Sequence, residues 1–249
     1  MMESFVPSYY VSVDLGKRQD FTAISILEEP IWLPDEETRW RGQLPDTVGT
    51  GWVAPAMLPT AVAQTNRRRN VAEGRPAQPP LRVLYLEREP LGVSYPQIVA
   101  RVHALLTRPP VADDCVLLVD ASGVGQPVVD EFELRGLQPH AITITGGNEV
   151  TQPGVRRFNT PKSLLVSALQ AALGGRRLQF ADDLPDLATL LRELEAFDLS
   201  VTEKMHDTYE GRAGEHDDLV LSVAQAVWFR GWFCKLLDDA VVGYAGGVA

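Results

Sequence analysis

The sequence has few cysteines, and the two that it has are far apart. Cys115 and Cys234 each lie within an apolar stretch of the 249 residues, and no CxxC pair or Cys/His cluster is present. A zinc centre is therefore not indicated, since zinc sites need several such ligands at close spacing. Both thiols are expected to lie in the core.

Long hydrophobic runs are also missing. No stretch approaches the roughly 18 apolar residues that cross a membrane. The first residues have neither the basic segment nor the apolar segment of a secretion signal. We therefore expect a globular, cytoplasmic protein without a membrane partner, long enough to bury a substantial core.

Positive charge is scarce: 23 Lys and Arg stand against 33 Asp and Glu, giving a net charge of −10. Such a balance argues against a protein that coats nucleic acid by bulk electrostatics. It does not exclude a nuclease, in which an acidic centre binds metal and local basic groups hold phosphate. Basic groups of this kind, each also explicable as solvated surface, are Arg67–Arg69, Arg156 and Arg157 with Lys162, and Arg176 with Arg177.

Two nucleotide-binding glycine motifs are absent. No G-x-x-x-x-G-K-[ST] occurs in the sequence, so a P-loop is not indicated. The stretch GVGQPV lacks the third glycine of a dinucleotide-binding turn, and no acid ends the following strand, predicted at 141–145.

What is present is an alternation of short strand patterns and amphipathic helix patterns. Strands are predicted at 9–13, 21–27, 82–88, 115–119 and 141–145, and helices at 95–106, 127–134, 161–174, 186–197 and from 217 onward. This order predicts an α/β fold with a mixed sheet, in which three antiparallel strands are followed by parallel strands flanked by helices. We expect a single domain over 1–236 and a flexible tail over 237–249. Residues 30–80, rich in proline and tryptophan, are predicted to be an irregular insertion that packs on the domain or contacts a partner.

Three acidic positions share one context in this order. Asp14 ends the first strand, Asp120 ends the first buried parallel strand, and Asp217 and Asp218 begin the last helix. Because the first and fourth strands can be neighbours, these carboxylates can meet at one edge of the sheet. Clustered carboxylates repel one another unless a cation joins them, and Mg²⁺ and Mn²⁺ prefer oxygen ligands. Taken singly, each acid is also explained as a turn residue or a helix cap.

Several motifs together resemble the nuclease domain of phage terminase large subunits, a member of the RNase H-like, RuvC-like superfamily. They are VDLGKRQDFTAI, LEREPLGVSYPQIV, LLVDASGVGQPVVDEFELRG, ITITGG, NTPKSLL and EHDDLVLSVAQAVW. They occur in the family's order between Tyr9 and Trp228, interrupted by the 30–80 insertion. DASGVG and HDDLV are moderately specific separately and more specific together.

The resemblance implies a metal-dependent endonuclease that uses two Mg²⁺ or Mn²⁺ ions on double-stranded DNA. Matched by motif, Asp14, Asp120 and Asp218 would hold the ions and Asp217 could assist or substitute. Asp20 and His216 would have supporting roles, and Arg156, Arg157 and Lys162 are the candidate phosphate contacts.

The sequence departs from the family in having no P-loop, so ATP-driven translocation is not carried over. The resemblance implies DNA packaging by a phage or prophage in the host cytoplasm, with a separate ATPase motor, portal or small terminase-like subunit as candidate partners. The residues leave two other hypotheses open: an actin-like or sugar-kinase-like ATPase, which shares the sheet order, and a non-catalytic packaging scaffold.

Overall fold

The computed structural model describes residues 9–16, 20–29, 80–112, 115–123, 126–181, 183–203 and 216–245, with side chains at 196–203 and 234–245 left out. The strands are β1 (Tyr9–Asp14), β2 (Ala23–Glu28), β3 (Leu81–Arg88), β4 (Cys115–Asp120), β5 (His140–Thr145), β6 (Thr151–Gly154), β7 (Arg157–Pro161) and β8 (Leu178–Phe180). The helices are α2 (Tyr95–Leu106), α3 (Gln126–Leu134), α4 (Lys162–Gly174), α5 (Leu187–Glu203) and α6 (Asp218–Ala245).

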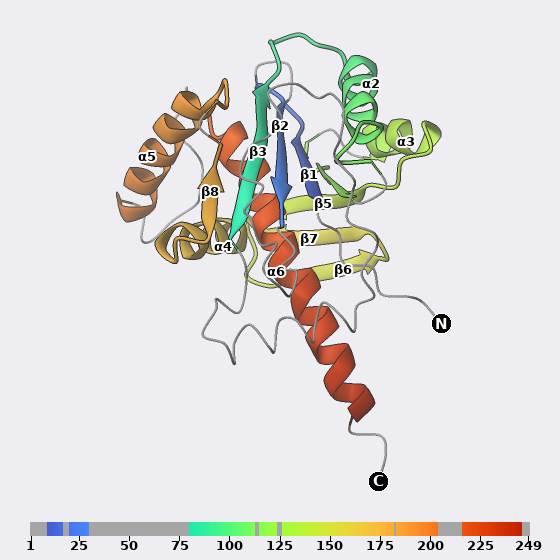
Figure 1. Ribbon diagram of the computed structural model, residues 1–249, viewed down its shortest axis with the longest axis vertical. Coiled ribbons are helices and arrows are strands. Elements are labelled where there is room, and N and C mark those ends of the chain that lie inside the picture. Colours follow the sequence, from blue (N-terminus) through green and yellow to red (C-terminus); the bar gives the residue numbers. More distant parts are fainter. Residues whose placement is uncertain are drawn as a thin grey trace, which may run out of the picture.

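All eight strands form one mixed sheet, in the order β6-β7-β5-β4-β1-β2-β3-β8 (Figure 1). β1, β2 and β3 are antiparallel neighbours, whereas β4 pairs parallel with β1, β5 parallel with β4, and β7 parallel with β5. The predicted fold class is confirmed: an antiparallel front of three strands is followed by parallel strands, as in the RNase H-like arrangement. The predicted adjacency of the first and fourth strands is confirmed as well.

Helices cover both faces of the sheet and divide the core in two. One cluster packs Tyr10, Leu118 and Ile142 of the sheet against α4 and α6. The other packs Val11, Val13 and Val119 against α2 and α3. Because side chains alternate along a strand, the even-numbered residues of β1 and β4 face α6 and the odd-numbered residues face α2 and α3. Asp14 and Asp120 therefore belong to the α6 face.

Three strands were not predicted from the sequence. β6 and β7 form an antiparallel pair beside β5, and β8 is a three-residue strand that pairs parallel with β3. Their sequences, TQPG, RFNTP and LQF, are short and lack the alternating apolar pattern of the other strands. Pairing with an existing sheet edge, a tertiary effect, decides their conformation.

The C-terminal segment is more regular than the sequence predicts. α6 continues to Ala245, so most of the segment expected to be a flexible tail is helical. The predicted insertion at 30–80 lies outside the described residues except at its last position. Within the described part of the chain, no helix is long and apolar enough to cross a membrane.

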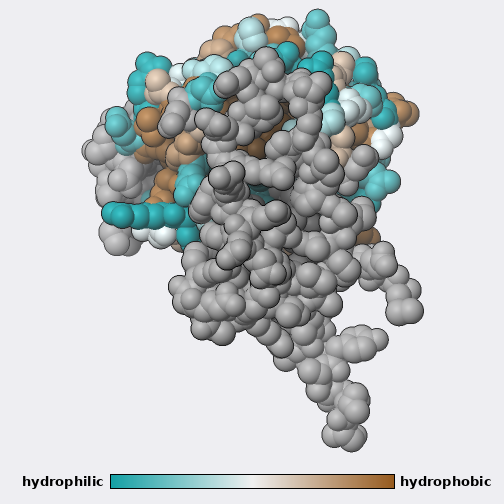
Figure 2. Space-filling model, viewed as in Figure 1, coloured by the Kyte–Doolittle hydropathy of each residue, from teal (hydrophilic) through white to brown (hydrophobic). Residues whose placement is uncertain are grey.

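The visible described surface mixes hydrophilic and hydrophobic residues (Figure 2). Large hydrophobic side chains with high exposure come from separate places in the chain, such as Leu134 at the end of α3 and Val155 in the turn between β6 and β7. Single exposed apolar residues are ordinary on globular proteins and indicate no interface.

Candidate functional site

Asp14 and Asp120 end neighbouring parallel strands on the same face of the sheet. In the register of β1 on β4, Val13 pairs with Val119. The next residue of each strand is an aspartate, so Asp14 and Asp120 occupy equivalent positions on the two strands. Both carboxylates are buried, with 6% and 8% exposure. Two acids predicted separately from the sequence are thus brought together by strand pairing.

The carboxylate of Asp120 is oriented by the turn that follows it. The Ser122 amide donates to Asp120 Oδ1 at 2.7 Å, and the Ser122 hydroxyl contacts the same oxygen. The Ser122 hydroxyl oxygen in turn accepts the amide of Ile144 in β5, at 2.6 Å. The motif DASGVG therefore fixes one aspartate oxygen and ties the turn to the neighbouring strand, which lowers the freedom of this carboxylate.

Asp14 is fixed by the tight connection between β1 and β2. The Gly16 amide donates to Thr22 Oγ1 at 3.1 Å, and the Tyr95 hydroxyl donates to the Gly16 carbonyl at 3.1 Å. A Cβ on Gly16 would lie 2.3 Å from the carbonyl oxygens of Asp20 and Phe21. Only glycine fits this approach, so the turn holds the end of β1, and Asp14 with it, in one place.

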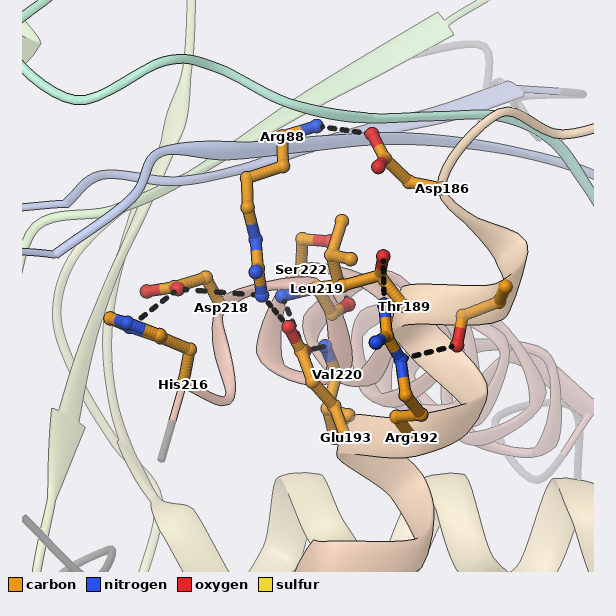
Figure 3. A network of polar contacts seen from close by, with 11 residues as sticks. Arg88, Asp186, Thr189, Arg192, Glu193, His216, Asp218, Leu219, Val220 and Ser222 are labelled. Carbon is orange, nitrogen blue, oxygen red and sulfur yellow. Dashed lines mark hydrogen bonds and ion pairs between the residues drawn. The ribbon is translucent and has the colours of Figure 1, made fainter. Parts of the chain in front are cut away.

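Asp218 is the first residue of α6 and is 7% exposed. Figure 3 shows its carboxylate between two side chains: Arg88 Nη2 lies 3.9 Å from Asp218 Oδ2, and His216 Nδ1 lies 3.7 Å from the same oxygen. Asp218 Oδ2 is nevertheless buried without a hydrogen-bond partner. A buried carboxylate oxygen without a hydrogen bond can accept a further partner, such as a cation.

Burial, first, and then the neighbouring carboxylates raise the pKa of Asp14 well above its usual value. Asp120 raises it through both its charge and a hydrogen bond, and the charges of Asp218 and Asp217 raise it further. All five of these effects raise the pKa of Asp14. An acid in such surroundings is stabilised either by a proton or by a metal ion.

The pKa of Asp218 is also raised, to about 6. Burial is the largest cause; Arg88 and His216 lower the pKa, while Asp217 and Asp20 raise it. The predicted supporting residues Asp20 and His216 therefore both act on Asp218 electrostatically. The ring of His216 additionally packs edge-on against Phe21, with centroids 4.8 Å apart.

The structure separates the predicted phosphate contacts. Lys162, which begins α4, lies at the acidic cluster, where its Nζ is 2.6 Å from Asp217 Oδ2. Arg157 instead contacts the side chain of Gln126 at the start of α3, on the face of the sheet opposite α6. Arg156 contacts Gln138. The two arginines are exposed and do not join the carboxylates.

Two residues of the site were missed in the sequence. Arg88 ends β3 and reaches Asp218, and Glu193 of α5 contacts both Arg88 and the start of α6 (Figure 3). The sequence does contain an indication of the role of Glu193, because this residue follows Leu190 by three positions and so lies on the apolar face of a helix. An acid on such a face is unusual because it must be buried, and it is 7% exposed here.

Within the described residues, no group of three or more His, Cys, Asp or Glu is arranged closely enough to hold a metal ion as it stands. The carboxylates instead turn to local partners: Asp120 to Ser122, Asp217 to Lys162, and Asp218 to Arg88 and His216. The donor set nevertheless suits a hard divalent cation, since it consists of carboxylate oxygens. Among them are Asp218 Oδ2, which has ion-pair neighbours but no hydrogen bond, and the oxygens of Asp14, whose pKa is raised by neighbouring carboxylates.

The fold and site together define an α/β protein with a buried acidic cluster at one edge of an RNase H-like sheet. Neither protein-family models nor curated proteins match this chain. Among solved structures, the large terminase nuclease from thermophilic phage G20c is similar over 90% of this chain and 84% of its own, at 19% identity and a TM-score of 0.47. The Mn-soaked human cytomegalovirus terminase nuclease domain is similar over the same shares, at 10% identity and a TM-score of 0.41.

Both of these structures are terminase nucleases, the class that the sequence motifs resemble.

Proposed function

We propose that this protein is a metal-dependent DNA endonuclease of the terminase type, acting in phage or prophage DNA packaging. The observation that supports it is the convergence of Asp14, Asp120 and Asp218 from two strands and a helix at one buried place, where the charges of Asp120 and Asp218 both raise the pKa of Asp14. Buried like charges destabilise a fold, so their presence together points to a function that needs them.

Asp14, Asp120 and Asp218 would hold two Mg²⁺ or Mn²⁺ ions, with Asp217 as a further ligand. Bound there, such ions would supply activation of a water molecule and charge stabilisation of the leaving oxygen of a phosphodiester. Asp14, on which the charges of Asp120, Asp218 and Asp217 all act, would be the central ligand of this site.

The protein's own residues prepare this site in separate ways. The Ser122 amide and hydroxyl hold Asp120 Oδ1, which fixes the direction of its second oxygen. The β1–β2 turn holds Asp14 at the strand end. Lys162 is the phosphate contact that the geometry favours, since it is the one of the three predicted basic residues that lies beside the carboxylates.

Double-stranded DNA is the proposed substrate. With a net charge of −10, the protein is expected to bind DNA weakly by itself. A separate ATPase motor, portal or small terminase-like subunit would then bring it to DNA in the host cytoplasm.

The deciding experiment is plasmid nicking in Mg²⁺ or Mn²⁺, comparing the native protein with Asp14→Ala and Asp218→Ala. Glu133→Gln, which removes one exposed negative charge from α3, is the control. We expect metal-dependent nicking by the native protein and the control, and a loss of at least about 100-fold in both aspartate variants.

Each other outcome has a definite meaning. Equal nicking by all variants would trace the activity to a contaminant. No nicking by any protein, together with DNA binding, would favour a packaging scaffold. ATP hydrolysis that disappears in Asp14→Ala would favour the kinase-like hypothesis.

A further inference from the structure

Glu193 of α5 caps the start of α6. Its Oε2 accepts the amide hydrogens of Leu219 and Val220, at 3.1 and 3.2 Å. The first amides of a helix have no partner within the helix, and they carry the positive end of its dipole. A carboxylate from another helix therefore fixes the very turn that carries Asp218.

The second oxygen of Glu193 has a different partner. Glu193 Oε1 forms a close ion pair with Arg88 Nη2, and the same nitrogen lies 3.9 Å from Asp218 Oδ2 (Figure 3). One guanidinium thus stands between two buried carboxylates, with Glu193 the nearer of the two.

Arg88 is held in this place by contacts that do not involve either acid's charge. Its guanidinium carbon lies 4.7 Å from the ring centroid of Phe21. Its backbone amide donates to Asp186 Oδ2 at 2.9 Å. Removing the charge of Glu193 would therefore leave the guanidinium where it is, beside Asp218.

We propose that Glu193 is a positioning residue that engages Arg88 and so keeps Asp218 available for a divalent cation. The inference rests on the proposed function, because it assigns a role in the same metal site. Arg88 and the cation compete for the same carboxylate. A buried guanidinium without its own counter-charge would pair with Asp218 instead, since an unpaired buried charge is costly.

The test is metal binding by the whole protein, measured by calorimetric titration with Mn²⁺ and by the Mn²⁺-induced rise in Tm. In Glu193→Gln, the amide oxygen can still accept the two α6 amides, but the charge that engages Arg88 is gone. We expect its Kd for Mn²⁺ to rise about 10- to 100-fold, the range typical of residues that orient metal ligands. Glu195→Gln makes the same chemical change at an exposed position of the same helix and should bind like the native protein.

The double variant Arg88→Met/Glu193→Gln separates competition from a structural effect. With the guanidinium removed as well, Mn²⁺ affinity should return to within about threefold of the native protein, a non-additive result that marks coupled residues. Arg88→Met alone should bind Mn²⁺ at least as tightly as the native protein, and this holds as a test even if Glu193→Gln does not fold.

Three results would overturn the inference while leaving the proposed function standing: unchanged affinity in Glu193→Gln, no recovery in the double variant, or weakened affinity in Arg88→Met. If the native protein neither binds Mn²⁺ nor nicks DNA, the proposed function itself has failed.

Discussion

Asp14 and Asp120 are buried side by side at the ends of two parallel strands, where Asp120 makes Asp14 harder to ionise. Strand register places them together, and burial with mutual repulsion raises the pKa of Asp14. Buried carboxylates that repel one another are expected to lower the stability of the metal-free protein, and a bound divalent cation is expected to restore it.

Asp14→Asn should stabilise the metal-free protein at neutral pH while abolishing cleavage. The substitution keeps the shape of the side chain and removes a charge that is buried among other negative charges. Thermal unfolding in chelator should show a higher Tm, by roughly 2–4 °C for each kcal/mol gained in a protein of this size. Glu133→Gln, at an exposed position, should leave Tm nearly unchanged. A lower Tm in Asp14→Asn would show that the aspartate is stabilising as it stands.

The stability of the metal-free protein should fall as pH rises through the range in which Asp218 ionises. Its pKa is about 6 in the folded protein against a reference of 3.8, so between these values the folded state binds more protons than the unfolded state. The free energy of unfolding therefore decreases with rising pH across this window and levels off above it. The Tm advantage of Asp218→Asn over the native protein should grow from about pH 4 to about pH 6. A constant difference over that range would contradict the raised pKa.

A divalent metal ion should raise the stability of the native protein. At a free Mn²⁺ concentration about 100 times its Kd, binding adds about 2.7 kcal/mol, which corresponds to a rise of roughly 5–10 °C in Tm. Asp14→Asn and Asp120→Asn should show little of this rise, because each lacks one proposed ligand. An equal rise in all three proteins would place the metal elsewhere.

Lys162→Ala should weaken DNA binding more than Arg157→Ala. Lys162 lies at the acidic cluster through Asp217, whereas Arg157 is on the opposite face of the sheet with Gln126. Loss of a phosphate contact reduces the slope of log affinity against log salt by about 1. Affinity measured over a salt series should show this change for Lys162→Ala and recovery in Lys162→Arg. The opposite ranking would place the DNA path across the α3 face.

Gly16→Ala and Gly231→Ala should have opposite effects on stability. A Cβ at Gly16 meets two backbone carbonyls at 2.3 Å, whereas a Cβ at Gly231, within α6, meets nothing within 4 Å. Gly16→Ala should cost about 1–3 kcal/mol through strain, and Gly231→Ala should gain about 0.5–1 kcal/mol through lower backbone entropy. Denaturant unfolding measures both, and Gly16→Ala should also lose cleavage, because the turn holds Asp14.

The sequence by itself determined the main strands, the helices between them and the acids that end or begin them. Strands such as Tyr9–Asp14 and Cys115–Asp120 were predictable because their apolar, β-branched residues favour one conformation locally. Alternation and strand order then brought Asp14 and Asp120 to one face. Local pattern and chain order suffice for such features.

Tertiary structure alone decided the surroundings of those acids. It placed Glu193 of α5 and Arg88 of β3, which are more than a hundred residues apart, beside Asp218. It also placed Arg157 on the face of the sheet opposite Lys162. It also made strands of β6, β7 and β8, whose sequences have little preference of their own. The physical reason is that ion pairs and edge-strand hydrogen bonds depend on which segments meet in space, and no local periodicity records which partner a charged side chain will find.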